Sequence, residues 1–504
     1  MRRVVLAAAL VGLFGCVGGA GKPIPLNPVR FLLINDVYVT DTMADGQGGL
    51  ARVATVRRRL EDQGPVIFVL AGDLLSPSLL SKYYNGHQMV EALDSAKLDY
   101  ATFGNHEFEL PVDTLAARIA ESKFKWLSSN CTLADGTPFA KVLPWDTVRV
   151  SGYKVGLFAL TLQGQYRKQV RCTNPDSAAH VVIDTLAAQG ADLIVGITHQ
   201  TIESDRDLLL RESRLDLILG GHEHEAHDSV VSGRHVVKAD ANSRSAQFVT
   251  LWGGKGEWRQ AVGLVHVDNR LPDDSLVGPV VRAWDDTLRR RLGPERTLGT
   301  TPVPIDARDA IGRTQESVLG DLVTDAMRAG THTDVAMLNA GTLRLDDVIK
   351  PGPITNYQLE SIFLFSDETR VISFTLSGSR LREILEHGVA DGSLGKGPFL
   401  QVSGVSFSYN PTAPSGARIV GDVSRQSGGP IRPTDTVNVA FPVYPACEGG
   451  DGYDVPEAKP GCDARASAPR AVDLLTGYIS DSLGGKIVQP VDGRIKKTTN
   501  TNPG

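Results

Sequence analysis

The segment Tyr100-Ala-Thr-Phe-Gly-Asn-His-Glu107 joins a short apolar run to a glycine and three polar side chains that can bind metals. The same order, an apolar run of strand length followed by such groups, occurs at four other places. These are Arg30–Ile34 before Asn35-Asp36-Val37-Tyr38, Val66–Leu70 before Ala71-Gly72-Asp73, Leu193–Ile197 before Thr198-His199, and Leu215–Leu219 before Gly220-Gly221-His222-Glu223-His224. Because the carboxyl ends of strands in an open α/β sheet face one crevice, we expect these groups to meet there.

The chemistry of these strand ends indicates a metal centre. Hard oxygen ligands mixed with imidazole suit Zn, Mn or Fe better than Ca or a thiolate site. A glycine before Asp73, Asn105 and His222 allows a sharp backbone turn, and alternation directs both His222 and His224 to the crevice while Glu223 points elsewhere. A single Gly-Asp is usually a turn and a single His is usually hydrogen-bonded core, but five such groups in order favour a metal site.

Helical patterns separate several of these strands, which is typical of an α/β fold. Helices are expected at Leu50–Leu60, Gly86–Leu93 and Pro111–Ile119, and a further strand at Val155–Leu160. A polar, proline-containing stretch around residues 269–274 precedes one amphipathic helix, Val277–Leu292, which we expect to link two domains. A second α/β pattern begins near Thr301, with a helix at Ser317–Ala329, a strand at Asp334–Leu338 and a helix at Ser379–Gly388.

Length and composition agree with a multidomain globular protein. The chain has 504 residues, and at roughly 150 residues per domain it should contain two or three domains. It is 41% hydrophobic and 22% charged, with a net charge of -6. Without a basic excess or a Lys/Arg run, binding to a nucleic-acid polymer is not expected.

The first residues resemble an export signal. Arg2 and Arg3 precede an apolar run, Val4–Phe14, which is too short to span a bilayer as a helix. Small and apolar residues directly before Cys16 resemble a bacterial lipoprotein signal, in which Cys16 becomes the lipidated first residue. The alternative is a secretory signal cut near Ala20, and both alternatives export the protein.

Four cysteines follow the signal, and an even number in an exported chain fits disulfides. They are Cys131, Cys172, Cys447 and Cys462, which allow three pairings. Sequence proximity favours Cys447 with Cys462 and, more weakly, Cys131 with Cys172. No CxxC motif is present, so a structural zinc site is not expected.

Together, the five strand-end motifs resemble those of the calcineurin-like metallophosphoesterases, and the resemblance covers roughly residues 29–267. It implies two divalent metal ions (Zn, Mn or Co), with Asp73 as the bridging ligand. Asp36 and His224 would complete one metal site, and the ligands of the other would be Asn105, His199 and His222. His106 would stand beside the metals without binding them, to stabilise the phosphate charge or to protonate the leaving oxygen.

One position departs from the family pattern. The first motif is usually Asp-x-His, but here Tyr38 takes the place of the imidazole. A phenol with a pKa near 10 is a poor ligand when neutral and favours a more charged ion, such as iron, when ionised. Three alternatives follow: Tyr38 binds iron, it lies beside a normally occupied site, or the first metal binds weakly and activity is reduced.

The second half resembles the C-terminal domain of 5'-nucleotidases from about Pro302 to Gly493. The motifs are Arg313-Thr-Gln-Glu316, Gly320–Met327, Asn339-Ala-Gly-Thr-Leu-Arg344, Phe363-Leu-Phe-Ser366 and Gly449-Gly-Asp-Gly-Tyr453. The resemblance implies substrate contacts by Arg313, Asn339 and Arg344, base stacking by Phe365 and Tyr444, and ribose binding by Asp451. Leu364, Ser366 and Asp367 replace the family's usual neighbours of the stacking phenylalanine, and Tyr444 is one residue upstream of the expected place.

We therefore expect an α/β (α+β) protein with a two-sheet metallophosphoesterase sandwich and flanking helices at residues 26–270. A linker helix at 271–300 would lead to a smaller C-terminal α/β substrate-recognition domain at 301–495, with a signal at 1–20 and a disordered tail at 496–504.

The resemblance implies hydrolysis of nucleoside 5'-monophosphates, with UDP-sugars or 2',3'-cyclic nucleotides as related substrates. The protein would act in the periplasm or at the outer membrane or cell surface, with membrane contact only through a lipid at Cys16. The alternatives are a catalytically weakened nucleotide-binding lipoprotein, because of Tyr38, and a related enzyme for sulfur or sugar-phosphate substrates. The sequence predicts no oligomeric state.

Overall fold

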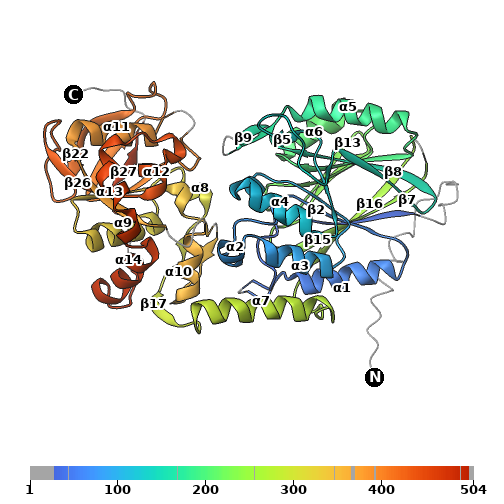
Figure 1. Cartoon of the computed structure of the whole chain (residues 1–504), viewed down its shortest axis with the longest axis horizontal. Helices are drawn as coiled ribbons and strands as arrows, with labels where there is room; N and C mark the ends of the chain where they lie inside the picture. The colour runs from blue at the N-terminus through green and yellow to red at the C-terminus, as the bar shows by residue number, and fades with distance from the viewer. Residues whose placement is uncertain are drawn as a thin grey trace.

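The structure, a computed structural model, describes residues 28–43, 45–166, 169–254, 256–345, 347–364, 369–390, 393–488 and 490–498. The expected signal and Cys16 lie outside these residues. Figure 1 shows two halves side by side, with helix α7 (Val277–Leu292) running beneath both. The bounds of α7 are those expected from the sequence.

Two sheets form the centre of the first half. The seven-stranded sheet has the order β16 (Arg259–His266), β15 (Ser245–Trp252), β1 (Val29–Ile34), β2 (Ile67–Ala71), β3 (Tyr100–Thr102), β4 (Lys125–Leu127) and β6 (Val142–Leu143). The six-stranded sheet has the order β13 (His227–Val231), β14 (Arg234–Lys238), β12 (Leu217–Gly221), β11 (Leu193–His199), β8 (Tyr153–Thr161) and β7 (Trp145–Val150). Phe31, Leu157 and Leu217 belong to one apolar cluster, so the sheets pack face to face.

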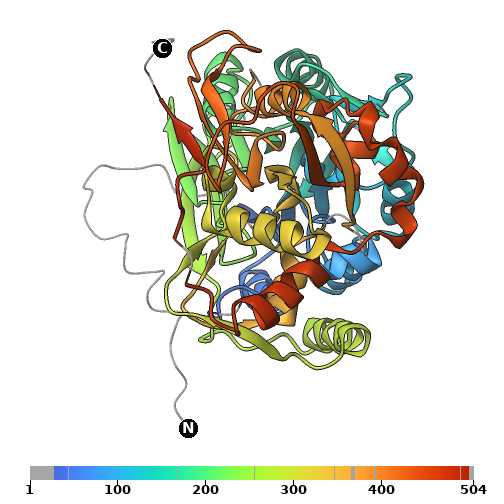
Figure 2. The same cartoon turned by 90° about the vertical axis from the view of Figure 1, so that its left-hand side faces the viewer.

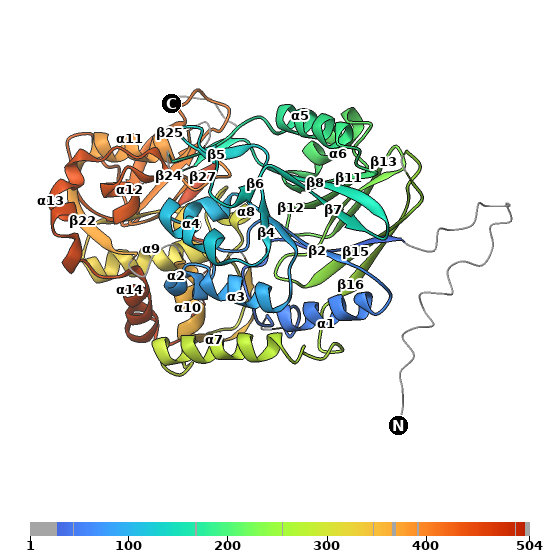
Figure 3. The same cartoon turned by 45° about the vertical axis from the view of Figure 1, so that its right-hand side comes forward.

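Helices cover the two outer faces of this sandwich, as Figures 1 and 3 show. One layer contains α1 (Leu50–Glu61), α2 (Leu79–Tyr84), α3 (His87–Ser95) and α4 (Val112–Glu121), and α7 packs against α1 and α3. The other contains α5 (Pro175–Ala188) and α6 (Ile202–Arg211). Strands β1, β2 and β11 are buried almost throughout, which is typical of sheets covered on both faces. The expected two-sheet α/β sandwich is confirmed.

A small third sheet contains β5 (Cys131–Leu133), β10 (Val170–Cys172) and β9 (Gly164–Tyr166). Cys131 and Cys172 face each other across its strands and form a disulfide, and Cys447 pairs with Cys462. Both pairings favoured by sequence proximity are confirmed.

The second half faces the viewer in Figure 2. Its main sheet has the order β22 (Val371–Ser377), β26 (Thr436–Pro442), β19 (Val335–Asn339) and β23 (Leu400–Ser403), and a second sheet contains β25 (Ile419–Arg425), β24 (Val405–Tyr409) and β27 (Ile495–Lys497). Two short pairs are β17 (Thr297–Thr301) with β21 (Gly352–Thr355) and β18 (Ile305–Asp306) with β20 (Val348–Ile349). The helices are α8 (Asp309–Gly312), α9 (Val318–Thr331), α10 (Asn356–Ile362), α11 (Gly378–Gly388), α12 (Val443–Cys447), α13 (Lys459–Asp463) and α14 (Ala471–Gly477).

The C-terminal strand corrects one expectation. The disordered tail was expected to begin at Lys496, but Lys496 and Lys497 pair with Ser408 and Tyr409 of β24 in parallel register. The neighbouring strand stabilises the backbone of this polar segment. The side chains of the segment give no sign of this pairing, so the sequence did not predict it. No helix in the described part of the chain has both the length and the apolar character needed to cross a bilayer.

Candidate metal centre

The two sheets bring the predicted ligands together at the ends of their strands. Asp36 follows β1, Asp73 follows β2, and Asn105 follows β3, which are adjacent in the first sheet. His199 ends β11, and His222 follows β12, its neighbour in the second sheet. Because the sheets pack face to face, the predicted ligands that follow their strands lie at one edge of the sandwich.

Four side-chain atoms form one compact group. The hydroxyl of Tyr38 lies 3.0 Å from His224 Nε2, 3.2 Å from Asp73 Oδ2 and 3.5 Å from Asp36 Oδ1. His224 Nε2 is itself 3.5 Å from Asp36 Oδ1. Ligand bonds of about 2.0–2.1 Å place neighbouring ligand atoms at about this separation. Tyr38 therefore converges on the same atoms as the side chains predicted to bind the first metal.

A second group surrounds His199. Its Nδ1 lies 2.9 Å from the carbonyl of Ala71, and its Nε2 faces Asp73 Oδ2 at 3.0 Å. Among the described residues, neither His199 Nε2 nor the buried Asn105 Oδ1 has a hydrogen-bond partner. Asp36, Asp73 and His199 each place a ligand atom within 4.8 Å of the others. Buried polar atoms are normally satisfied, so these orphaned atoms and this mixture of donors fit a divalent metal ion.

The electrostatics of the site also favour a positive charge. Burial alone lowers the pKa of His199, but Asp73 and Asp36 outweigh it and raise that pKa to about 9. Burial raises the pKa of Asp73, but His199 and His106 lower it well below its usual range. Burial and the neighbouring His199 lower the pKa of His222 to about 4, so its ring is held neutral, as a metal ligand must be.

The backbone is strained where it presents these side chains. Asp36, Asp73, His222 and His224 all have positive φ, at 52°, 57°, 96° and 63°. Such conformations cost about 1–3 kcal/mol each and persist where the surroundings impose them, as at functional sites. A Cβ on Gly104 would clash with the carboxylate of Asp73, so glycine is required there.

Glu107 supports this strained loop, a role that the sequence did not reveal. Its carboxylate accepts hydrogen bonds from the backbone N–H groups of Asp73, Leu74, Leu75 and Gly104, at 2.6–2.9 Å. Burial and the charge of Asp73 raise the pKa of Glu107 to about 7. The Gly-Asn-His-Glu motif contains the residue, but only the folded chain shows which loop it holds.

His106 lies beside the predicted metal ligands rather than among them. Its Nε2 is 3.9 Å from Asp73 Oδ2, and its Nδ1 is 2.5 Å from Glu109 Oε1. Burial lowers the pKa of His106, but Glu109 and Asp73 outweigh it, so the pKa is raised. The i, i+3 spacing on a short 3-10 helix could have identified Glu109 as a partner of His106.

The second half places Arg344 against this site. Its guanidinium lies 3.1 Å from His106 Nδ1 and 3.3 Å from Glu109, and 3.7 Å from Asp309, which also pairs with Arg313. Predicted residues from both halves therefore meet at Arg344.

The other residues predicted to bind substrate differ in their surroundings. Asn339 donates to Asp451 at 2.6 Å, and burial raises the pKa of that carboxyl. Tyr444 is 50% exposed and lies beside Gly450. Phe365 lies outside the described residues.

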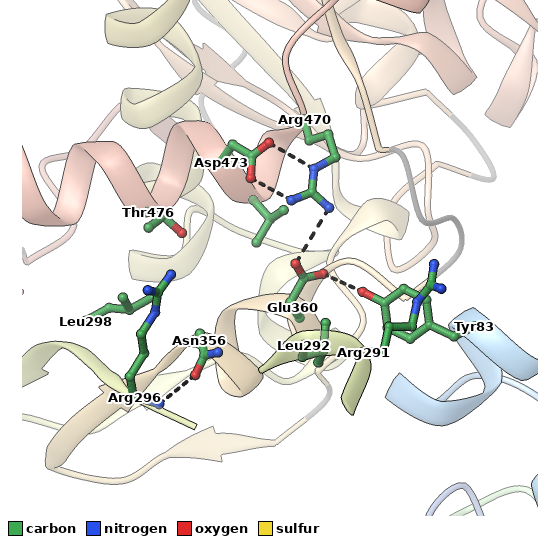
Figure 4. Close-up of a pocket in the computed structure, with 11 residues that line it drawn as sticks. Tyr83, Arg291, Leu292, Arg296, Leu298, Asn356, Glu360, Arg470, Asp473 and Thr476 are labelled. Carbon is green, nitrogen blue, oxygen red and sulfur yellow. Dashed lines mark hydrogen bonds and ion pairs between the residues drawn. The ribbon is translucent and has the colours of Figure 1, made fainter. Parts of the chain in front are cut away.

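A separate pocket of about 500 Å³ lies between the halves and contains none of the predicted ligands. Figure 4 shows Glu360 of α10 between Arg470 and Tyr83, with Arg291 against the ring of Tyr83 and Arg296 on the facing wall. The contact between Tyr83 and Glu360 joins α2 to the second half, and Arg291 packs the end of α7 against α2.

Comparisons with known proteins agree with this geometry. Residues 29–226 match the calcineurin-like phosphoesterase family, and residues 297–458 match the 5'-nucleotidase, C-terminal domain family. A snake venom 5'-nucleotidase of Naja atra is 24% identical over 509 residues, which cover 90% of this chain and 94% of that protein.

Two solved structures share the fold over nearly the whole chain. A 5'-nucleotidase precursor from Thermus thermophilus has a TM-score of 0.76 at 22% identity and covers 94% of this chain and 100% of that one. The sulfate thiohydrolase SoxB of the same species has a TM-score of 0.72 at 18% identity, with coverage of 96% and 99%. The fold alone thus does not select the substrate.

The two family matches follow each other in the order of the two halves, and the strand-end residues predicted to bind metal lie in the first match. The nucleotidase relative spans both halves. The chain therefore belongs to the 5'-nucleotidase family and is a metal-dependent phosphoester hydrolase with a calcineurin-like phosphoesterase domain and a 5'-nucleotidase C-terminal domain.

Proposed function

We propose that this protein is an exported enzyme that hydrolyses nucleoside 5'-monophosphates to nucleoside and phosphate. The observation that carries the proposal is the position of Arg344, which reaches from the second half to His106, beside Asp36, Asp73 and His199. A nucleotide fits this arrangement, because its phosphate can meet the metal-binding groups while its nucleoside contacts the other half. UDP-sugars and 2',3'-cyclic nucleotides share these chemical groups and are included as candidate substrates.

We assign the ligands of two divalent ions as follows. Asp73 would be shared by both ions, Asp36 and His224 would hold the first, and Asn105, His199 and His222 would hold the second. The contacts of 3.0–3.5 Å around the Tyr38 hydroxyl support Tyr38 as a further ligand of the first ion. Zn, Mn, Co or iron at these positions would polarise the phosphoryl oxygens and acidify a water molecule.

His106 is assigned as the group that donates a proton to the leaving oxygen or stabilises the phosphate charge. Its short contact with Glu109 orients the ring, so that Nε2 faces the metal-binding carboxylate of Asp73. A positioned acid of this kind typically contributes about 10²–10⁴-fold to the rate. Arg344 lies against the same ring, where its planar guanidinium can bind two phosphate oxygens.

Nucleoside recognition is assigned to the second half. Asp451 would bind the ribose hydroxyls, supported by its hydrogen bond from Asn339. Exposed Tyr444, with Phe365, would stack on the base. Stacking contributes about 1–3 kcal/mol per base and tolerates every base, so broad nucleotide use is expected.

The domain limits and location remain part of this proposal. We place the metallophosphoesterase domain at 26–270, the linker helix at 271–300 and the recognition domain at 301–495, although β27 now extends that limit to Lys497. Export to the periplasm or cell surface is supported by the two disulfides, and anchoring by a lipid at Cys16 is supported by the sequence before that residue.

The deciding experiment measures phosphate release from AMP by the purified mature chain, stripped of metal and supplied with Mn, Zn, Co or Fe in turn. Asp73→Asn is the control, since it removes the assigned bridging ligand. Metal-dependent release that disappears in this variant is expected. A visible charge-transfer band in the iron-loaded protein, lost in Tyr38→Phe, is the outcome expected if Tyr38 is a ligand.

A second function is favoured by Tyr38, because the usual imidazole is missing from the first site. If no metal supports release from AMP or from a panel of phosphoesters, while calorimetry shows tight AMP binding, the protein retains nucleotides without cleaving them. Activity on sulfur or sugar-phosphate esters alone would identify a related hydrolase with another substrate.

A further inference from the structure

A lysine is completely buried directly behind the metal centre. Lys238, the last residue of β14, is 0% exposed. Its ammonium lies 2.9 Å from Asp205 and 2.5 Å from Glu223, and it donates to the carbonyls of Gln200 and Gly221 at 2.7 and 2.8 Å. A buried charge is tolerated only when it is paired and hydrogen-bonded, and Lys238 meets that condition with four oxygen atoms.

The local sequence makes room for this side chain. Gly220 of β12 lies opposite Lys238 in the sheet, and a Cβ on Gly220 would lie 2.8 Å from Lys238 Cε and 3.0 Å from Asp205. The lysine can therefore cross the strand only because residue 220 has no side chain. Glu223, between the two histidines of the Gly-His-x-His motif, points away from the metal site and towards this ammonium.

The carbonyl of Gly221 belongs to the peptide unit whose N–H is that of His222. Lys238 donates to this carbonyl at 2.8 Å, and the N–H donates to Asp36 Oδ2 at 2.8 Å. One peptide plane is therefore fixed from both sides, by Lys238 on one side and by an assigned metal ligand on the other. The orientation of this peptide plane sets the position of the His222 backbone. His222 also has the largest positive φ of the assigned ligands, 96°.

The second carbonyl lies on the neighbouring strand. Gln200 directly follows His199, and His199 pairs with Gly221 between β11 and β12. By holding the carbonyls of Gln200 and Gly221, Lys238 links the two strand ends that present both histidines. The side-chain amide of Gln200 also donates to Asp205 at 3.2 Å, so the carboxylate of Asp205 and the backbone carbonyl of Gln200 belong to one hydrogen-bond network.

We propose that Lys238, with Asp205 and Glu223, is a positioning residue that sets the geometry of His199 and His222 and thereby the affinity of the second metal ion. This inference rests on the metal assignment proposed above. The lysine touches neither substrate nor metal, and acts through the two peptide units. Partners of this kind behind a metal site typically change metal affinity by about 10–100-fold when mutated.

The test measures Mn²⁺ binding to the metal-stripped full chain by titration calorimetry. In Lys238→Met, one of the two ions should bind about 10–100-fold more weakly, while the other binds as in the wild type.

The matched control is Arg234→Met, because Arg234 lies on the same strand and donates to the carbonyls of Leu209, Glu212 and Leu215 at 2.6–2.8 Å. Its removal should destabilise the domain without changing Mn²⁺ affinity, since it lies at the other end of β14.

The possible outcomes separate this inference from the proposed function. Wild-type affinity for both ions in folded Lys238→Met, or an equal loss in Arg234→Met, overturns the positioning role while leaving the metal centre intact. Absence of Mn²⁺ and Zn²⁺ binding to the wild-type chain overturns the metal assignment itself. If Lys238→Met does not fold, Gly220→Ala displaces the ammonium without removing it and should weaken binding of the same ion; unchanged affinity there also overturns the inference.

Discussion

The ion pair between Lys82 and Glu360 should control how the two halves are held together. Lys82 Nζ lies 2.7 Å from Glu360 Oε2, and the side chains are only 1% and 12% exposed. The pair joins α2 of the first half to α10 of the second, and Tyr83 donates to the same carboxylate at 3.2 Å. We predict that Glu360→Gln, which removes the negative charge but keeps the shape, opens this contact.

The magnitude follows from burial. Removing one partner of a buried ion pair costs about 3–5 kcal/mol, because the remaining charge is left unpaired. Lys82 can regain water if the halves separate, without unfolding of either. At about 1.4 kcal/mol per tenfold change, that cost shifts the equilibrium between closed and open arrangements by about 10²–10⁴-fold.

Small-angle X-ray scattering should show a larger radius of gyration for Glu360→Gln, and AMP hydrolysis should fall if Arg344 must meet His106. The double variant Lys82→Met/Glu360→Leu removes both charges and should recover the closed form. Asp463→Asn, which breaks the exposed Lys459–Asp463 pair, is the control. It should change neither the radius of gyration nor the rate of AMP hydrolysis. A radius of gyration and a stability equal to those of the wild type in Glu360→Gln would refute the reasoning.

Two further predictions concern stability. Burial, opposed by Arg494 and reinforced by Glu316 and Asp492, raises the pKa of Asp321 to about 8, so the folded state holds a proton that the unfolded chain has released above about pH 4. The free energy of unfolding should therefore fall as pH rises from 4 to 8, and Asp321→Asn should reduce that fall in denaturant titrations; an equal fall in both proteins would contradict this. Replacing Cys131 and Cys172 by serine opens a loop with a sequence separation of 41, which by the chain-entropy estimate costs about 4 kcal/mol, and an unchanged denaturation midpoint would contradict the prediction.

The sequence predicted the strand ends well because burial and polarity change together there. Runs such as Val66–Leu70 lie in strands covered on both faces, so their hydrophobicity is continuous and the first polar residue marks the end. The strand expected at Leu215–Leu219 is instead β12, Leu217–Gly221. Glycine usually indicates a turn, but Gly220 stays in the sheet, where its missing side chain makes room for Lys238.

The supporting residues could not be predicted, because their roles depend on contacts far along the chain. Glu107 accepts hydrogen bonds from a loop more than thirty positions earlier, and Lys238 acts on two other strands. A lysine at the end of an apolar strand ordinarily indicates an exposed position. Only the packing of β14 against β12 places its ammonium among four oxygen atoms.

The charges of the two halves explain why the site should require both. The first half gathers the buried carboxylates of Asp36 and Asp73 and the partly exposed Glu109, and the second half presents Arg344 to Glu109. Arg344 forms ion pairs with Glu109 and Asp309 in this arrangement. A phosphate entering beside His106 offers the guanidinium a bidentate partner, so substrate binding and closure of the halves should strengthen each other. Because coupling is reciprocal, a change that opens the halves, such as Glu360→Gln, should weaken nucleotide binding, and at most by the factor by which nucleotide favours the closed form.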